Sequence, residues 1–167
     1  MSETKLNNEL ISNNNKRIVV SMKRNRLTLL GADGKKIKEF PIIYGRNSAE
    51  GTKEIEGDQK TPRGKYYICY INEQSQFTLF FGLSYPGNID GVKGYAKGLV
   101  NLDELTEIFL TNRLKQKPPW YTKLGGEIGI HGGGIDRDGT RGCIAMKDED
   151  VIELGSHIFK GMEVEIN

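Results

Sequence analysis

The chain contains few sulfur and imidazole groups: two cysteines, Cys69 and Cys143, and two histidines occur among its 167 residues. Two cysteines are too few for the disulfide frameworks that hold small secreted domains together. A zinc site needs ligands at short spacings, and the sequence has neither a Cys-x-x-Cys nor a His-x-x-x-His pair. We therefore expect no metal and no other cofactor. Cys69 lies in the apolar run YYICYI, which predicts a buried core thiol.

Long hydrophobic runs and a strong net charge are also absent. No apolar stretch approaches the roughly 18 residues of a membrane span, and the N-terminus does not have the charged and then apolar pattern of a signal peptide. The formal net charge is +2 without a basic stripe, so nucleic acid is not an expected partner. Residues 1–16 include five asparagines and predict a polar linker. The rest, residues 17–167, predicts one domain because 37% hydrophobic residues can form a sizeable core.

The chain does contain a glycine-rich segment, EIGIHGGGIDRDGTRGCIAM at 127–146, that places one histidine before one cysteine. His131 follows an alternating apolar stretch, which predicts a rigid position at the end of a strand. A free thiol has a pKa of about 8.5 and is mostly protonated at neutral pH unless a base assists it. We therefore interpret Cys143 as a nucleophile and His131 as its general base.

The competing interpretation is that Cys143 is a buried thiol and His131 a packing residue, since both are common roles. Five glycines in the eleven residues 132–142 favour the catalytic interpretation, because glycine at such positions indicates a backbone requirement. Backbone N–H groups of Gly142 and Cys143 can point at a carbonyl under attack and form an oxyanion hole. The hydroxyl of Thr140 can brace the same turn.

Periodicity predicts a mainly β fold with about two short helices. Strand patterns at 17–21, 26–30 and 36–45 predict a β-meander. Further strands are expected through Ile71, over 76–83 and over 162–166, with a turn over 72–75 and a polar loop over 48–60. Helical spacing predicts one helix from about 102 to 115, ended by two prolines, and another after the cysteine with Asp148 as its cap.

The segment IHGGG followed by TRGCIAM resembles the signature of the L,D-transpeptidase catalytic domain, or YkuD-like, family, in which a histidine strand precedes a Ser/Thr-x-Gly-Cys turn. GDQKTPRGKYYI at 57–68 is similar to the GDxKTPxGxYxI segment of that family. LSYP at 83–86, with Asp90, is similar to its LSYPN segment, and LGGE at 124–127 also fits. The resemblance covers residues 17–167 in several ordered motifs.

The resemblance implies a β-sandwich-like catalytic fold and a bacterial cell-wall enzyme that acts at the third residue of peptidoglycan stem peptides. The implied reaction is L,D-transpeptidation, which forms 3-3 crosslinks or attaches a wall protein. An L,D-carboxypeptidase or endopeptidase using the same site, and a non-catalytic wall-binding module, remain alternatives. The resemblance also implies a monomer, inhibition by carbapenems and an extracytoplasmic location, with membrane contact only through a signal or anchor missing from this chain.

Carried over residue by residue, the resemblance makes Cys143 the nucleophile and His131 its base. A carbonyl in the glycines that begin at Gly132 would orient the imidazole, and Gly142 would share the oxyanion hole with Cys143. The substrate-binding candidates are Arg141, Thr140, Gly133, Tyr85 and Trp120.

Two departures from the family leave the acyl acceptor open: Arg141 stands where many members have a second histidine, and Ala145 where many have arginine or asparagine. The Arg141 guanidinium can bind a stem-peptide carboxylate bidentately, although most arginines lie in solvent. Tyr85 and Trp120 can line an apolar wall of the cleft or simply pack in the core.

Overall fold

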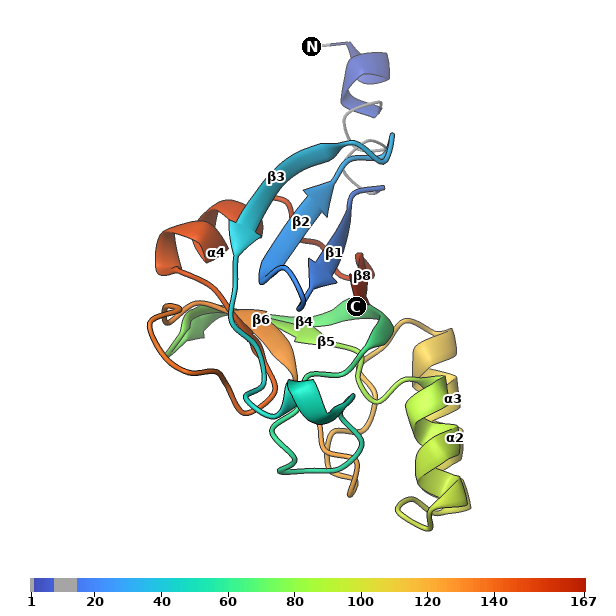
Figure 1. The fold of residues 1–167 in the computed structure, drawn as a ribbon. Helices are drawn as coiled ribbons and strands as arrows, with labels where there is room; N and C mark the ends of the chain where they lie inside the picture. Colours follow the sequence, from blue (N-terminus) through green and yellow to red (C-terminus); the bar gives the residue numbers. More distant parts are fainter. Residues whose placement is uncertain (1, 8–14) are drawn as a thin grey trace.

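The computed structural model describes residues 2–7 and 15–167 and has a mainly β architecture (Figure 1). The described part contains the strands β1 (Arg17–Ser21), β2 (Arg26–Leu30), β3 (Lys36–Pro41), β4 (Gly64–Ser75), β5 (Thr78–Leu83), β6 (Gly129–His131), β7 (Ile144–Ala145) and β8 (Glu163–Ile166). Its helices are η1 (Ser48–Glu50), α2 (Asn88–Ala96), α3 (Leu102–Arg113) and α4 (Asp148–Gly155), with a short helix over residues 3–7. The predicted mainly β fold with few helices is confirmed, whereas much of the predicted 1–16 linker lies outside the described residues.

The strands follow the order β3-β2-β1-β8-β4-β5-β6-β7, with β4 joining two halves. The first part of β4 pairs with β8 over Gly64–Tyr67, and the remainder pairs with β5. In Figure 1, β1–β3 stand above β4, β5 and β6, α4 lies on one side, and the paired helices α2 and α3 lie on the other. The His131 strand, β6, therefore sits in the half of the sheet formed by β4–β7.

The meander strands form because apolar residues alternate along them, as their sequences predict. In β1 and β2 every second residue is fully buried, among them Ile18, Val20, Leu27 and Leu29, so one face of each strand contributes to the core. The parallel pairing of β1 with β8 then brings the C-terminal strand beside them. Burial of these side chains stabilises the meander against the rest of the core.

Two helix predictions are confirmed, whereas α2, η1 and the short helix over residues 3–7 were not predicted. α3 begins with a capping box in which Asn101 and Glu104 exchange side-chain and backbone hydrogen bonds. α2 gave no amphipathic pattern because it contains two glycines, and its apolar residues such as Ile89 are exposed. Those glycines permit close packing, since a Cβ on Gly94 would lie 2.6 Å from Leu124 Cδ2.

The predicted turn over 72–75 was wrong. β4 continues to Ser75, and the chain reverses over Gln76 and Phe77 before β5 begins at Thr78. The shift moves the hairpin tip to within contact of the histidine strand. No helix formed by residues 2–7 or 15–167 has the length and apolarity that a membrane crossing requires.

Candidate active site

His131 ends β6 between two neighbouring strands. It pairs with Phe80 of β5 and with Ala145 of β7, which fixes its backbone. Its Nδ1 lies 2.6 Å from the carbonyl oxygen of Gly132. Because a carbonyl only accepts, Nδ1 carries the proton and Nε2 is left as the acceptor. This is the tautomer that a general base requires, and Gly132 supplies the orienting carbonyl expected from the glycine segment.

Aromatic rings cover the imidazole. Phe77 stacks on His131 with ring centroids 4.4 Å apart and an interplanar angle of 26°, and Phe80 lies farther away at 6.4 Å. Only 4% of His131 is exposed. Burial lowers the pKa of His131 below its ordinary value of 6.5, so the ring is neutral at neutral pH.

Cys143 is half-buried at the end of the turn that leads into β7, and its thiol donates to the Glu127 carbonyl across 3.4 Å. Burial raises the pKa of the Cys143 thiol, and the backbone N–H of Gly129 and the charge of Lys53 oppose this only in part. At neutral pH the resting pair is therefore a thiol and a neutral imidazole. Proton removal must then accompany nucleophilic attack.

The two groups line one open cleft of about 630 Å³, a size that suits a small-molecule or peptide site. The walls of this cleft are formed by Tyr70, Asn72, Gln74, Ser75, Gln76, Phe77, Phe80, Lys117, Trp120, Glu127, His131 and Cys143. The structure thus brings together in one cleft the predicted base, the predicted nucleophile and Trp120, one of the substrate-binding candidates.

The backbone around the nucleophile is held by two threonines. Thr140 Oγ1 accepts the Gly142 N–H at 3.0 Å and donates to the Cys143 carbonyl at 2.5 Å, which confirms that Thr140 braces this turn. Thr61 Oγ1 donates to the Gly142 carbonyl at 2.7 Å and accepts the Gly45 N–H at 2.9 Å. Thr61, in the Lys-Thr-Pro segment at 60–62, therefore holds the nucleophile turn in place, a role that the sequence did not reveal.

These bonds decide which N–H groups face a substrate. Gly142 N–H is engaged by Thr140, whereas Cys143 N–H has no acceptor within residues 2–7 and 15–167. Of the two predicted oxyanion donors, Cys143 is the one that the resting structure leaves available. Gly142 is needed for another reason: its φ is +140°, and a Cβ there would lie 3.0 Å from the Lys60 carbonyl oxygen.

The tip of the β4–β5 hairpin is fastened to the glycine segment. Gly132 N–H donates to the Phe77 carbonyl at 3.0 Å, and a Cβ on Gly132 would lie 2.6 Å from that oxygen. Asp148 Oδ1 accepts from the Gly133 N–H at 2.8 Å and from the Thr78 hydroxyl at 2.7 Å. Phe77 and Asp148 were not predicted as site residues, because their positions depend on contacts between distant segments.

We expect Asp148→Ala to slow carbapenem acylation of Cys143 about three- to tenfold, because the hairpin tip and Gly133 lose their shared acceptor. Phe77 and the Gly132 carbonyl, which hold the imidazole, are then less firmly positioned. Asp148→Asn retains an oxygen acceptor and should stay within about twofold of wild type. Asp150→Ala, at the same end of α4, is the matched control. Acylation rates from intact-protein mass spectrometry provide the measurement, and a wild-type rate for Asp148→Ala would contradict the positioning role.

Four of the five substrate-binding candidates do not line the cleft. Tyr85 is completely buried and donates from its hydroxyl to the Leu124 carbonyl at 2.9 Å, so it is a core residue. Thr140 is buried under the nucleophile turn. Arg141 is exposed beside that turn and does not line the cleft. Gly133 is exposed in the glycine segment, where Asp148 accepts its N–H.

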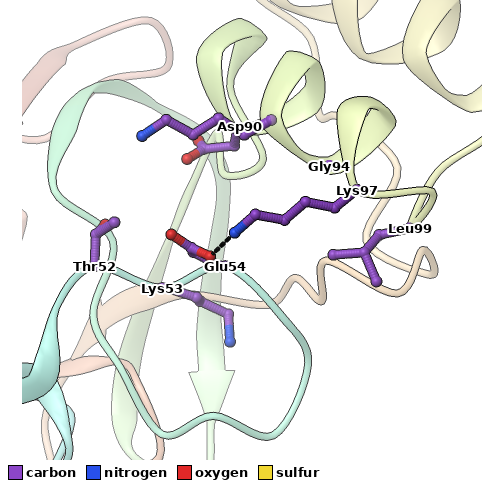
Figure 2. A pocket seen from close by; sticks show the side chains of 8 residues that line it. Thr52, Lys53, Glu54, Asp90, Gly94, Lys97 and Leu99 are labelled. Carbon is purple, nitrogen blue, oxygen red and sulfur yellow. Dashed lines mark hydrogen bonds and ion pairs between the residues drawn. The ribbon is translucent and has the colours of Figure 1, made fainter.

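A second, smaller hollow lies between the 52–54 segment and α2, as Figure 2 shows. Lys97 pairs with Glu54 across it, and Lys53 points away from Asp90. Lys53 instead forms a buried ion pair with Asp58 at 3.0 Å. Backbone N–H groups and Lys53 hold the pKa of Asp58 below its ordinary value despite its burial. Neither His131 nor Cys143 lines this hollow, and the ion pairs of Lys53 and Lys97 order the loop that precedes Thr61.

Comparison with known proteins bears on the fold that holds this site. The family model of the YkuD L,D-transpeptidase catalytic domain matches residues 15–166. The structure resembles that of the helical cell shape determining protein Pgp2 from Campylobacter jejuni, with 27% identity and a TM-score of 0.63 over 91% of this chain and 47% of that one. It also resembles Bd1075 from Bdellovibrio bacteriovorus, with 20% identity and a TM-score of 0.56 over 92% of this chain and 48% of that one.

A third solved structure, LdtMt1 in complex with imipenem, has 11% identity and a TM-score of 0.51 over 92% of this chain and 59% of that one. The chain spans about half the length of Pgp2 and Bd1075. A search of curated proteins finds no match. The predicted L,D-transpeptidase fold is confirmed.

Proposed function

The chain belongs to the YkuD family of L,D-transpeptidase catalytic domains, and we propose that it is a peptidoglycan L,D-transpeptidase acting by cysteine acyl transfer at the third residue of stem peptides. The observation that carries this proposal is the placement of His131 and Cys143 in one cleft, with Nδ1 of the imidazole fixed on the Gly132 carbonyl. That contact leaves Nε2 able to accept the thiol proton.

In the first half-reaction, His131 Nε2 takes the Cys143 proton while Sγ attacks the carbonyl carbon of the third stem residue. The Cys143 N–H is available to stabilise the negative charge that develops on the carbonyl oxygen of that residue. Collapse of the tetrahedral intermediate breaks the bond to the terminal D-residue, whose amine receives the proton from the imidazolium. The product of this step is a thioester on Cys143.

The second half-reaction regenerates the thiol. The side-chain amine of a neighbouring stem attacks the thioester carbonyl, and His131 accepts the amine proton. The C–S bond then breaks, the imidazolium returns the proton to Sγ, and a 3-3 crosslink results. A wall-protein amine would give attachment by the same chemistry. Water as the acceptor would make the enzyme an L,D-carboxypeptidase or endopeptidase. Ala145, one of the departures from the family pattern, is completely buried and does not line the cleft.

The proposal includes the setting in which the enzyme works. Stem peptides lie outside the cytoplasmic membrane, so we place the active protein in the periplasm or cell wall. All groups of the site come from one chain, so a monomer suffices. Imipenem was bound to a structural relative, and Cys143 is the expected acylation site for carbapenems here. An intact nucleophile and base disfavour a purely wall-binding module.

Incubation of a purified disaccharide-tetrapeptide with the protein, followed by mass spectrometry, tests the proposed reaction. We expect a crosslinked dimer that lacks one terminal D-alanine. A tripeptide without dimer would replace transpeptidation by hydrolysis at the same site. An unchanged tetrapeptide, under conditions in which a carbapenem acylates the protein, would contradict this substrate assignment.

A further inference from the structure

One end of the cleft has aromatic walls and a lysine. Tyr70 meets Trp120 at a centroid distance of 6.0 Å with an interplanar angle of 78°, and Phe80 at 6.3 Å. Lys117 Nζ lies 4.8 Å from the centroid of the Trp120 ring and 5.9 Å from that of Tyr70. Ring faces attract cations, so two rings hold the ammonium group at a defined place in the cleft.

The backbone that carries Lys117 is also fixed. Tyr67 donates from its hydroxyl to the carbonyl of Gln116 at 2.6 Å, and two buried prolines follow Lys117. Trp120 packs so tightly on Gly126 that a Cβ there would lie 2.4 Å from Trp120 Cβ. The lysine is thus presented by an ordered segment, which limits the entropy that binding a ligand would cost.

Two hydrogen-bond donors at this end lack acceptors. Among the described residues, no carboxylate lies within 4.0 Å of Lys117 Nζ. The indole N–H of Trp120 is buried and makes no hydrogen bond in the described structure. The indole nitrogen is enclosed by protein, so the exposed ammonium of Lys117 is the donor that a ligand in the cleft can reach.

We propose that Lys117 and Trp120 form a subsite for a carboxylate of the peptide substrate, with the ammonium as its principal partner. Glu127 is the one acidic side chain that lines the described cleft, and its carbonyl accepts from the nucleophile. The positive charge of Lys117 therefore lies at the aromatic end of the cleft, and the negative charge of Glu127 lies at the end with the thiol. This inference rests on the proposed function, because it identifies the group on the stem peptide that the aromatic end binds.

Binding to catalytically inactive protein tests the subsite separately from the reaction. Calorimetry would compare the disaccharide-tetrapeptide with two derivatives, one amidated at its C-terminal carboxylate and one at the α-carboxylate of its second stem residue. In the Cys143→Ala background we expect one derivative to bind about tenfold more weakly than the parent, because a charge-assisted contact is lost. The derivative affected identifies which carboxylate occupies the subsite.

The same comparison with Lys117→Gln added should show parent and amides binding alike, each about as weakly as the affected amide. Lys117→Arg should restore most of the preference for the carboxylate. Lys115→Gln is the matched control, because Lys115 also stacks on a tyrosine, at 4.6 Å from the Tyr67 ring, but outside the cleft. It should retain the full preference.

An equal loss of affinity for parent and amides in Lys117→Gln, or no loss, would overturn the subsite. Absence of measurable tetrapeptide binding to the Cys143→Ala protein would overturn it as well. A carboxylate preference that depends on Lys117, together with no turnover by wild-type protein, would support the subsite and refute the proposed reaction.

Discussion

Replacement of Cys143 by alanine is expected to lower turnover of the disaccharide-tetrapeptide by about 10⁴-fold or more, since removal of a nucleophile eliminates the covalent route altogether. The structure supports this magnitude because Cys143 is the cysteine that lines the cleft, opposite a neutral imidazole. Release of D-alanine, or loss of tetrapeptide by chromatography, gives the rate. Folding of the variant is checked by its thermal unfolding transition.

Cys69→Ala is the matched control for this prediction. Cys69 is 8% exposed within β4, and burial raises the pKa of its thiol to about 12, so it is not a competent nucleophile at neutral pH. We expect near wild-type turnover for a variant that remains folded. Turnover that survives in Cys143→Ala and disappears in Cys69→Ala would reverse the assignment.

Substitution of His131 by glutamine is expected to lower kcat/KM by about 10²- to 10⁴-fold, the usual contribution of general base catalysis. Glutamine keeps a polar group near the Gly132 carbonyl but cannot accept the thiol proton. The effect should fall mainly on acylation, because Cys143 begins the reaction as a protonated thiol. Stopped-flow measurement of carbapenem acylation isolates that step.

The pH dependence of wild-type acylation provides an independent check on His131. Burial lowers the pKa of His131, and only the neutral ring can act as a base, so activity should persist as the pH falls to 6.5 and decline below it. In His131→Gln this acid limb should be absent. An acid limb well above pH 6.5 in wild type, or an unchanged limb in the variant, would contradict the role of His131.

The proposed catalytic pair could be predicted because its signals are local in sequence. His131 follows an alternating apolar stretch of sequence, and Cys143 follows directly on the last glycine of the glycine-rich segment. The meander, α3 and α4 were also predictable, since burial alternates along β1 and β2 and α3 starts at a capping box. Each of these features depends on neighbours within a few residues.

The features that sequence reasoning missed depend on contacts across the fold. Phe77 covers the imidazole only because β4 runs to Ser75 and moves the hairpin tip. The sequence predicts Asp148 as the cap of α4, but the cap position is Lys147. The Asp148 carboxylate instead accepts hydrogen bonds from Thr78 and Gly133. Tyr85 looked like a cleft residue, but its aromatic ring is buried in the core. Tertiary placement of a side chain is not encoded in local periodicity.

The most direct test of the central assignment is intact-protein mass spectrometry with peptide mapping after exposure to imipenem, performed on wild-type and Cys143→Ala proteins. We predict that wild type gains one drug mass on the peptide containing Cys143 and that Cys143→Ala gains none. Equal labelling of the two proteins, or an adduct on Cys69, would contradict the identification of Cys143 as the nucleophile.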